Sequence, residues 1–308
     1  MAKRYLTAGA HVTVYDNFSS GKRWHLEPFT SSSNLEIIQA DINDLERLTS
    51  GLRGQDLVYH FASNPDIARA VTEPGVDFWE GTFLTHQVME GMRVAGAPRL
   101  VYASGSGVYG DSGLQSVSET FSPMRPISTY GASKLAGEAL ACSYSYMFGL
   151  QVRVFRFANV VGANQTHGVA FDFIRRLTQD PTRLRILGDG TQSKSYIYVE
   201  DVLAAIAWVL NLPDPHSFDV YNVSTPDTIT VREIAEVVIE EMGLDVSRIK
   251  FDFTGGDRGW KGDVPIVRID ASKIRSAGWQ PRFNAKEAMR EAVKRMLTEP
   301  RIVQDLHG

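Results

Sequence analysis

The sequence predicts an α/β protein with a doubly wound parallel sheet and a smaller α/β lobe after it. Short apolar, β-branched runs alternate with helical patterns through the first half of the 308-residue chain, and this alternation gives a parallel sheet covered by helices on both faces. After residue 160 the sequence becomes Gly-rich and irregular, with amphipathic helices in between. We therefore expect a first domain over 1–160, to which 196–224 returns, and a second lobe over 161–308.

The elements follow in order along the chain. Strands are expected at 11–15, 35–39, 56–62, 99–104 and 151–159, with helices over 77–95 and 128–148. Further helices are expected over 199–211, 230–242 and 284–297. Ligands of such sheets collect at the carboxyl ends of the strands, and polar residues follow these predicted strands at Asp16, Asp41, Ser63, Ser104 and Asn159.

Composition favours small-molecule chemistry. The net charge of -4, without a dense Lys/Arg stripe, argues against a nucleic-acid partner. The longest apolar run, 202–210, is far shorter than the roughly 20 residues that cross a bilayer, and the N-terminus has no secretory pattern. With one cysteine, Cys142, no intrachain disulfide can form. We expect a cytoplasmic protein with no membrane partner and no metal site, in which His60 is a core histidine.

The most informative pair is Tyr130 and Lys134, which stand four residues apart. On a helix they share a face, so the hydroxyl and the ammonium can act on one substrate atom. A free tyrosine has a pKa of about 10, and a base near neutral pH needs it lowered by about 3 units, or roughly 4 kcal/mol. A neighbouring ammonium contributes to this. The spacing alone fits a solvated helix face equally well. The other motifs are therefore needed to choose between a catalytic pair and a solvated face.

Seven segments in order resemble the extended short-chain dehydrogenase/reductase family, and within it the NAD-dependent nucleotide-sugar epimerases. The resemblance covers nearly the whole chain. The segments are Val14-Tyr15-Asp16-Asn17, Ala40-Asp41-Ile42, His60-Phe61-Ala62-Ser63, Ala103 to Gly110, Tyr130 to Lys134, Arg156 to Gly162 and Gly188-Asp189-Gly190-Thr191-Gln192.

The resemblance implies an NAD site in the first domain. Asp16, with Asn17, would bind the adenosine ribose, and its carboxylate would repel a 2'-phosphate, which favours NAD over NADP although Lys22 and Arg23 lie close by. The other implied cofactor contacts are Asp41 and Ile42 beside the adenine, Phe61, Ala62 and Ser63 along the middle, and Tyr130 and Lys134 at the nicotinamide end. For Asp16 and Asp41 the alternative is ordinary turn chemistry after a strand.

The second lobe would bind the nucleotide sugar, most simply a UDP-sugar. Asn159 would lie against the diphosphate, with backbone contacts near Val169, Ala170 and Phe171. Cations would neutralise the phosphates: Lys194, where many relatives carry arginine, and Arg258 or Lys261. The volume around 169–173 and Tyr196 would set the choice of sugar.

The implied reaction is epimerisation at C4 through a 4-keto intermediate, with Tyr130 as base and Lys134 lowering its pKa. Three departures stand out. Met1 to Gly9 corresponds only to the end of the first helix of the family, so the first strand and Gly-rich turn are not represented, and we expect the strands beside them to lack a neighbour. Gly105 stands where relatives carry a serine or threonine that hydrogen-bonds the reacting oxygen. The substitute is Ser104, Ser106 or a water, and strand alternation points both serines to the opposite face from residue 105. Gly81 replaces a helix asparagine.

Other reactions and roles stay open. Ser106-Gly107 lacks the Asp-Glu pair of the family's 4,6-dehydratases and the glutamate of its decarboxylases. Epimerisation of a different nucleotide sugar, 4-keto reduction, and a catalytically silent sugar-nucleotide-binding protein remain as alternatives. The resemblance also implies a homodimer formed through the helices at 77–95 and 128–148.

Overall fold

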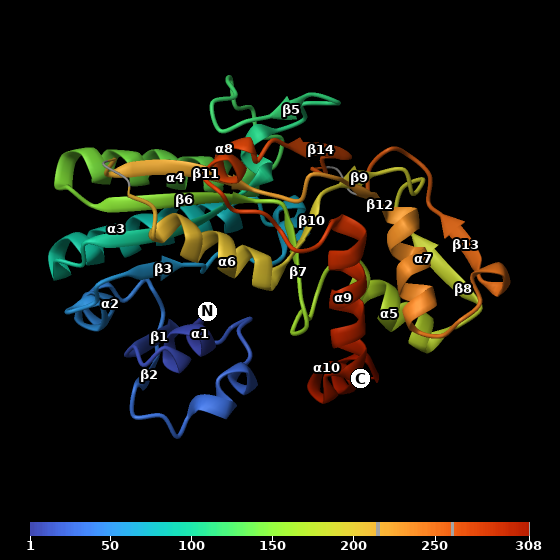
Figure 1. Cartoon of the computed structure of the whole chain (residues 1–308), viewed down its shortest axis with the longest axis horizontal. Helices are drawn as coiled ribbons and strands as arrows, with labels where there is room; N and C mark the ends of the chain where they lie inside the picture. The colour runs from blue at the N-terminus through green and yellow to red at the C-terminus, as the bar shows by residue number, and fades with distance from the viewer. Residues whose placement is uncertain (214–215, 260–261, 308) are drawn as a thin grey trace. The chain divides into compact units, whose positions relative to one another are not determined.

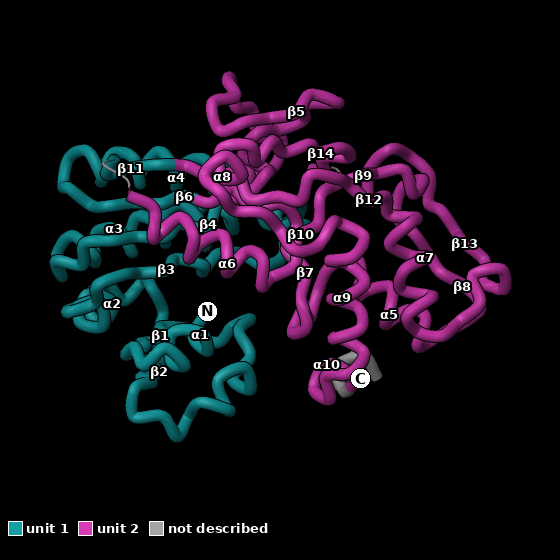
Figure 2. Tube along the Cα trace, viewed as in Figure 1, with its two compact units in different colours: residues 1–104, 132–154, 214–219 teal, residues 105–131, 155–213, 220–308 magenta. Residues whose placement is uncertain are grey.

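The computed structural model describes residues 1–213, 216–259 and 262–307. Two compact units, distinguished by colour in Figure 2, make up the chain: residues 1–104, 132–154 and 214–219, and residues 105–131, 155–213 and 220–308. The units are defined by contacts and are not continuous in sequence. The division at residue 160 that we expect from the motifs is a division by binding role, and it stays a prediction.

Parallel strands dominate the first unit, as predicted. β1 (Val12–Asp16) and β2 (Leu35–Gln39) form a parallel pair. A second sheet has the strand order β11-β6-β4-β3, with β3 parallel to β4. Figure 1 labels β3, β6 and β11 of this sheet. Its strands are β3 (Val58–His60), β4 (Arg99–Gly105), β6 (Gln151–Phe157) and β11 (Phe218–Val223), of which β4, β6 and β11 end in the second unit. The predicted strands at 11–15, 35–39 and 99–104 coincide with β1, β2 and β4 to within one residue, and those at 56–62 and 151–159 contain the shorter β3 and β6.

The sheet of the first unit is divided between β1 and β3. Among the described strands, β1 pairs only with β2, and β3 pairs only with β4. Helix α1 (Ala2–Thr7) precedes β1, and its Tyr5 hydroxyl is hydrogen-bonded to that of Tyr59 on β3. Helix α2 (Leu45–Leu52) packs on both β1 and the next helix, α3 (Leu84–Ala95).

The two long predicted helices are present. α4 spans Thr129–Phe148. The expected helix over 77–95 consists of a π-helical turn, Phe78–Phe83, followed by α3, Leu84–Ala95. The wide turn coincides with Gly81, whose backbone lies so close to Ser133 on α4 that a Cβ would overlap the serine hydroxyl. A side chain at position 81 would therefore require the Ser133 hydroxyl to move.

The second unit contains more regular structure than its Gly-rich sequence predicts. The predicted helices are α6 (Val199–Leu210), α7 (Val231–Glu241) and α9 (Ala285–Thr298), the last two beginning with capping boxes at Thr230/Glu233 and Asn284/Glu287. Helices α5 (Val169–Gln179), α8 (Ser272–Ser276) and α10 (Pro300–His307) were not predicted. The strands are β5 (Ser116–Val117), β7 (Asn159–Val161), β8 (Arg183–Ile186), β9 (Ser193–Lys194), β10 (Tyr196–Tyr198), β12 (Ile229–Thr230), β13 (Lys250–Phe253) and β14 (Ile266–Ile269).

These strands form three small sheets, β10-β7, β13-β8 and β12-β9-β14-β5. Helix α9 packs on β7 and β10, and α5 packs on α7, which covers the apolar faces of these helices. Within the described residues, no helix is long and apolar enough to cross a membrane.

Candidate active site

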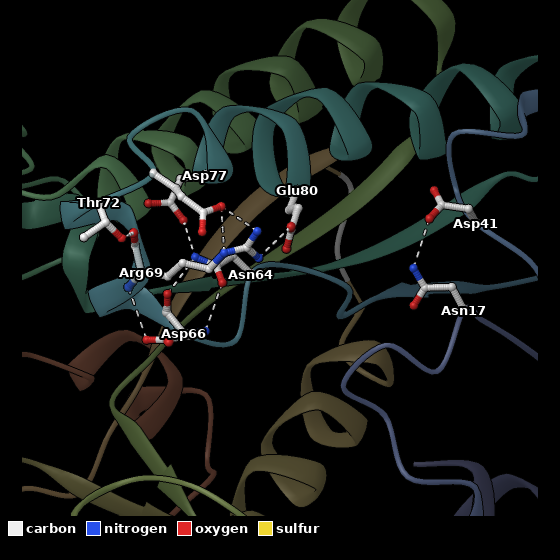
Figure 3. Close-up of polar contacts among 9 residues, drawn as sticks. Asn17, Asp41, Asn64, Asp66, Arg69, Thr72, Asp77 and Glu80 are labelled. Atoms are coloured by element: carbon white, nitrogen blue, oxygen red, sulfur yellow. Dashed lines mark hydrogen bonds and ion pairs between the residues drawn. The ribbon is translucent and has the colours of Figure 1, made fainter.

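The ends of β1 and β2 bring three of the predicted cofactor residues together. Asp16 ends β1, and its Oδ1 accepts a hydrogen bond of 2.7 Å from the Phe18 backbone N–H. Asn17 Nδ2 donates to Asp41 Oδ2 at 3.0 Å (Figure 3). The Asn43 backbone N–H and the Asn17 amide hold the pKa of Asp41 below its usual value. Two carboxyl groups thus lie at neighbouring strand ends, and each also takes part in the turn chemistry of its own loop.

The end of β3 presents the next predicted segment. The Phe61 side chain is half exposed. Ser63 Oγ is buried and has no hydrogen-bond partner among the described residues. Because an unsatisfied buried hydroxyl costs about 1–3 kcal/mol, it is a site at which a bound group can form a hydrogen bond.

His60 is a core histidine, as expected. It is buried, its Nε2 lies 3.0 Å from Thr85 Oγ1, and its ring stacks on Tyr102. Burial, and secondarily the charge of Lys134, lower the pKa of His60 to about 3.

This shift predicts acid sensitivity. Because the unfolded chain takes up a proton near pH 6.5 and folded His60 does so only near pH 3, stability is complete above about pH 6.5 and falls below it, by about 2 kcal/mol at pH 5. His60→Gln is expected to remove this part of the loss between pH 7 and pH 5 in urea titrations. The exposed His11→Gln serves as the control, and an unchanged pH dependence in His60→Gln would contradict the assignment.

Lys134 is buried and hydrogen-bonded to the end of β4. Only 5% of the residue is exposed, and its Nζ donates to the Ala103 carbonyl at 2.9 Å. Burial lowers the pKa of Lys134 to about 8, against the opposing charge of Asp77. Asp77 is itself buried at the start of the π-helical turn, where Asn64 Nδ2 donates to it at 2.9 Å (Figure 3).

Ser104 forms a side-chain hydrogen bond within the first unit. Its Oγ donates to Glu138 Oε1 at 2.5 Å, and both residues are buried. The Ser104 hydroxyl is therefore already hydrogen-bonded to the side chain of Glu138. Glu138 was not singled out from the sequence, although its position four residues after Lys134 is the signal that would have found it.

Tyr130 and the loop after β4 lie in the second unit. Tyr130 is half-buried in the first turn of α4. The next residue, Gly131, packs so closely on Gly107 that a Cβ would overlap the Gly107 carbonyl oxygen. Ser106 begins the short helical turn Ser106–Tyr109, while Gly105 before it has an extended backbone with φ of -161°. Tyr130 and Lys134 share α4 at the predicted spacing of one helical turn.

Two predicted substrate residues become neighbours in the second unit. Asn159 on β7 is the register partner of Tyr196 on β10. Tyr196 is buried, which raises the pKa of its phenol, as does the charge of Asp263. Val169 begins α5 after Gly168, while Phe171 packs in the core. At Phe171, therefore, only the backbone is suited to the contact that the resemblance implies.

The two predicted cations meet at Asp263. Lys194 Nζ forms an ion pair with Asp263 Oδ1 at 2.5 Å, and an Arg258 guanidinium nitrogen donates to the Asp263 carbonyl at 2.9 Å. Arg258 also pairs with Asp111 at 2.7 Å and thereby lowers the pKa of that carboxyl. Sequence reasoning missed both acids. Lys261, the alternative to Arg258, lies outside the described residues.

Comparisons with known proteins agree with this organisation. The model of the NAD dependent epimerase/dehydratase family matches residues 1–224. A putative UDP-glucose 4-epimerase of Methanocaldococcus jannaschii is 27% identical over 290 residues, which cover 92% of this chain and 90% of that protein.

Solved structures give the same result. A UDP-galactose 4-epimerase structure aligns with a TM-score of 0.85 at 33% identity and covers 97% of this chain and 94% of its own. The UDP-glucose 4-epimerase of Thermus thermophilus, solved with NAD, aligns with a TM-score of 0.82 at 28% identity and covers 96% and 93%. The chain belongs to the NAD dependent epimerase/dehydratase family.

Proposed function

We propose that this protein epimerises a nucleotide sugar at C4, of the UDP-glucose/UDP-galactose type, with NAD as the cofactor and no net oxidation. The observation that carries the proposal is the pair on α4, with Tyr130 one helical turn from a buried lysine whose pKa is lowered to about 8. Several similar proteins are named as UDP-glucose or UDP-galactose 4-epimerases, which supports this reaction. The proposed location is the cytoplasm.

The residues of the first unit fit NAD. The carboxylates of Asp16 and Asp41 suit the hydroxyl and amino groups of an adenosine, Ser63 Oγ is a buried hydroxyl without a partner, and Lys134 presents an ammonium at the end of β4. Asn17, Ile42, Phe61 and Ala62 complete the proposed contacts. When bound, NAD supplies a reversible hydride acceptor.

The chain's own residues then manage the proton. Tyr130 accepts the proton of the C4 hydroxyl. It returns the proton after the keto sugar has rotated and presents its other face. Lys134 stabilises the phenolate by its positive charge. Ser106 is the proposed donor to the reacting oxygen, and we assign Ser104 a positioning role instead because its proton is bound by Glu138.

The second unit is proposed to hold the nucleotide sugar. Asn159 and the backbone from Val169 to Phe171 would contact the diphosphate, and Tyr196 would line the sugar site. Lys194 and Arg258 would neutralise the phosphates by exchanging their present carboxylate partners, Asp263 and Asp111, for phosphate oxygens.

The test is incubation with UDP-galactose, UDP-glucuronate and their C4 epimers, with products separated by chromatography. Interconversion without net consumption of NADH or NADPH supports the proposal. Stoichiometric consumption of NADPH on a 4-keto sugar would identify a reductase. Tight sugar-nucleotide binding without turnover of any of these would identify a silent binding protein.

Gly105→Ser is expected to raise kcat, by about tenfold, because it restores a hydrogen-bond donor for the reacting oxygen. The structure accepts the side chain: the backbone is extended, and a Cβ at this position would lie 3.9 Å from the nearest atom, the Phe157 carbonyl oxygen. Gly105→Ala is the matched control, which adds the Cβ without the hydroxyl. Equal rates for the two variants would contradict a donor role at this position.

We also propose a homodimer formed through α3 and α4. An aromatic band, consisting of Phe78, Trp79, Phe83, His86, Tyr144 and Phe148, runs over the π-helical turn, α3 and α4 with ring centroids 5.0 to 6.5 Å apart. Trp79 is 60% exposed, and near the band's end Tyr146 is 93% and Met147 68% exposed. Exposed aromatic groups gathered in this way are typical of protein interfaces.

If the dimer forms through this band, acidic substitutions at the interface are expected to dissociate it. Trp79→Glu combined with Tyr146→Glu is expected to shift a dimer to monomer in sedimentation at micromolar concentration, because unpaired carboxylates would be buried at the interface. The circular dichroism spectrum is expected to stay unchanged, since both side chains are exposed. A monomeric parent protein at the same concentration would refute the dimer.

A further inference from the structure

Three successive residues at the end of β4 are each bound to α4. The Tyr102 hydroxyl donates to the Lys134 carbonyl at 3.4 Å, Lys134 Nζ donates to the Ala103 carbonyl at 2.9 Å, and Ser104 Oγ donates to Glu138 Oε1 at 2.5 Å. The last contact joins the serine hydroxyl to a carboxyl group. All of these residues belong to the first unit.

The Ser104–Glu138 pair is deeply buried. Ser104 is 6% and Glu138 4% exposed. A buried carboxyl group is costly unless it is hydrogen-bonded, and Ser104 Oγ supplies a hydrogen bond to Glu138. An apolar pair of similar volume would fill the same space without this cost. The pair is therefore better explained by the geometry that it fixes than by its contribution to stability.

That geometry concerns Lys134 directly. Glu138 lies one helical turn after Lys134 and two turns after Tyr130, so the three side chains share one face of α4. Because the helix rises only about 1.5 Å per residue, the hydrogen bond at position 138 lies one turn from Lys134. It therefore restrains α4 against β4 close to the lysine. At the same strand end, Ala103 binds the lysine and Ser104 binds the glutamate.

Close packing leaves little freedom for α4 on this strand. Gly137 lies against the Tyr102 ring so tightly that a Cβ would overlap the phenol. Tyr102 is itself buried, and the ring centroid lies 5.4 Å from Lys134 Nζ. The helix can therefore approach β4 closely, and the hydrogen bonds at 134 and 138 fix where along the strand it does so.

We propose that Glu138 and Ser104 are positioning residues, which together hold Lys134 at the position along β4 that its role requires. This proposal rests on the proposed function of Lys134 and adds two residues to it. Neither residue touches the reacting atoms. Loss of the pair frees α4 to shift along β4, which loosens the bond between Lys134 and Ala103.

The experiment compares Ser104→Ala, Glu138→Leu, Glu138→Gln and the double variant Ser104→Ala/Glu138→Leu. Since a misplacement of about 1 Å can cost about 10²-fold in rate, kcat is expected to fall between about 10-fold and 10²-fold in the first two, with KM changed less than about twofold. Glu138→Gln keeps an acceptor for the serine and is expected to stay within about fivefold of the parent. The double variant is expected to be no slower than the slower single variant, because both lose the same contact.

A second readout does not depend on turnover. Lys134 is buried in the parent, so its acetylation by acetic anhydride at pH 8, quantified by mass spectrometry of its peptide, is expected to be slow. Acetylation is expected to be about fivefold faster or more in Ser104→Ala and Glu138→Leu, and unchanged in Glu138→Gln, because local opening sets the access of the reagent. Ser143→Ala, on the exposed side of the same helix, is the matched control for both readouts.

The outcomes separate the two proposals. Parental kcat and parental acetylation in Ser104→Ala would overturn the positioning role, as would a rise in KM alone or additive losses in the double variant. If Glu138→Leu does not fold, Ser104→Ala and Glu138→Gln decide. A parent that epimerises no sugar, but in which Ser104→Ala exposes Lys134, would count against the proposed function and in favour of the positioning role.

Discussion

Tyr130→Phe is expected to lower kcat by about 10²- to 10⁴-fold, the range over which general acid–base groups contribute. The substitution removes one oxygen atom and leaves the ring, so the half-buried position in the first turn of α4 stays filled. The reaction then has no group at this position to take the proton from the sugar hydroxyl. KM is expected to change less than kcat, because the lost interaction acts mainly in the transition state.

The control is Tyr146→Phe on the same helix, where the side chain is almost fully exposed. The same chemical change there is expected to leave turnover unaffected. Quantifying NAD released on denaturation of each purified variant separates loss of chemistry from loss of cofactor. Equal turnover in Tyr130→Phe and the parent, with equal NAD content, would remove Tyr130 from the reaction.

The strands and long helices of the first half could be predicted because their patterns are local. The run at 35–39 coincides with β2, and the pattern at 128–148 is α4 to within one residue. The regular elements of the second unit are harder. The predominantly two- to four-residue strands there, such as β9 and β12, are too short to show a period. Helix α5 begins directly after a glycine at φ of 95°, and the Gly-rich segment before it concealed its amphipathic pattern.

The candidate site could be predicted in its residues but not in its pairings. Alternation along β4 indicates that Ser104 points away from the face of residue 105, but only the packing of α4 shows that its partner is Glu138. Likewise, Lys194 and Arg258 were singled out as separate cations, and nothing in the sequence relates either of them to Asp263 or Asp111. Contacts between residues far apart in sequence depend on tertiary packing, which periodicity does not describe.

Lys134→Met is expected to abolish most turnover and yet to make the protein more stable. The pKa of Lys134 is about 8 in the folded protein, compared with an ordinary value of 10.5. At pH 7 the folded state therefore carries the cost of a buried ammonium, and this cost exceeds the attraction of Asp77. A methionine of similar length fills the space without the charge. After loss of the hydrogen bond to Ala103, the net gain is expected to be about 2 kcal/mol.

The pH dependence distinguishes this explanation from simple repacking. Because the unfolded lysine keeps its proton up to about pH 10.5 and the folded one loses it near pH 8, the stability of the parent rises over this range. Lys134→Met lacks this rise, so its advantage in urea titrations is expected to be largest at pH 7 and to shrink as the pH approaches 10. Lys294→Met, at an exposed position of α9, controls for loss of a surface charge.

Lys134→Met is also expected to lose activity. The ammonium stabilises the phenolate of Tyr130 in the proposed reaction, so its loss is expected to lower kcat by about 10²-fold or more. A variant that is more stable and nearly inactive would show that the fold bears a cost for holding Lys134 charged and buried, as expected where function and stability conflict. A variant less stable than the parent at pH 7 would mean that Lys134 is held mainly by favourable contacts, and that its burial is not a cost to the folded state.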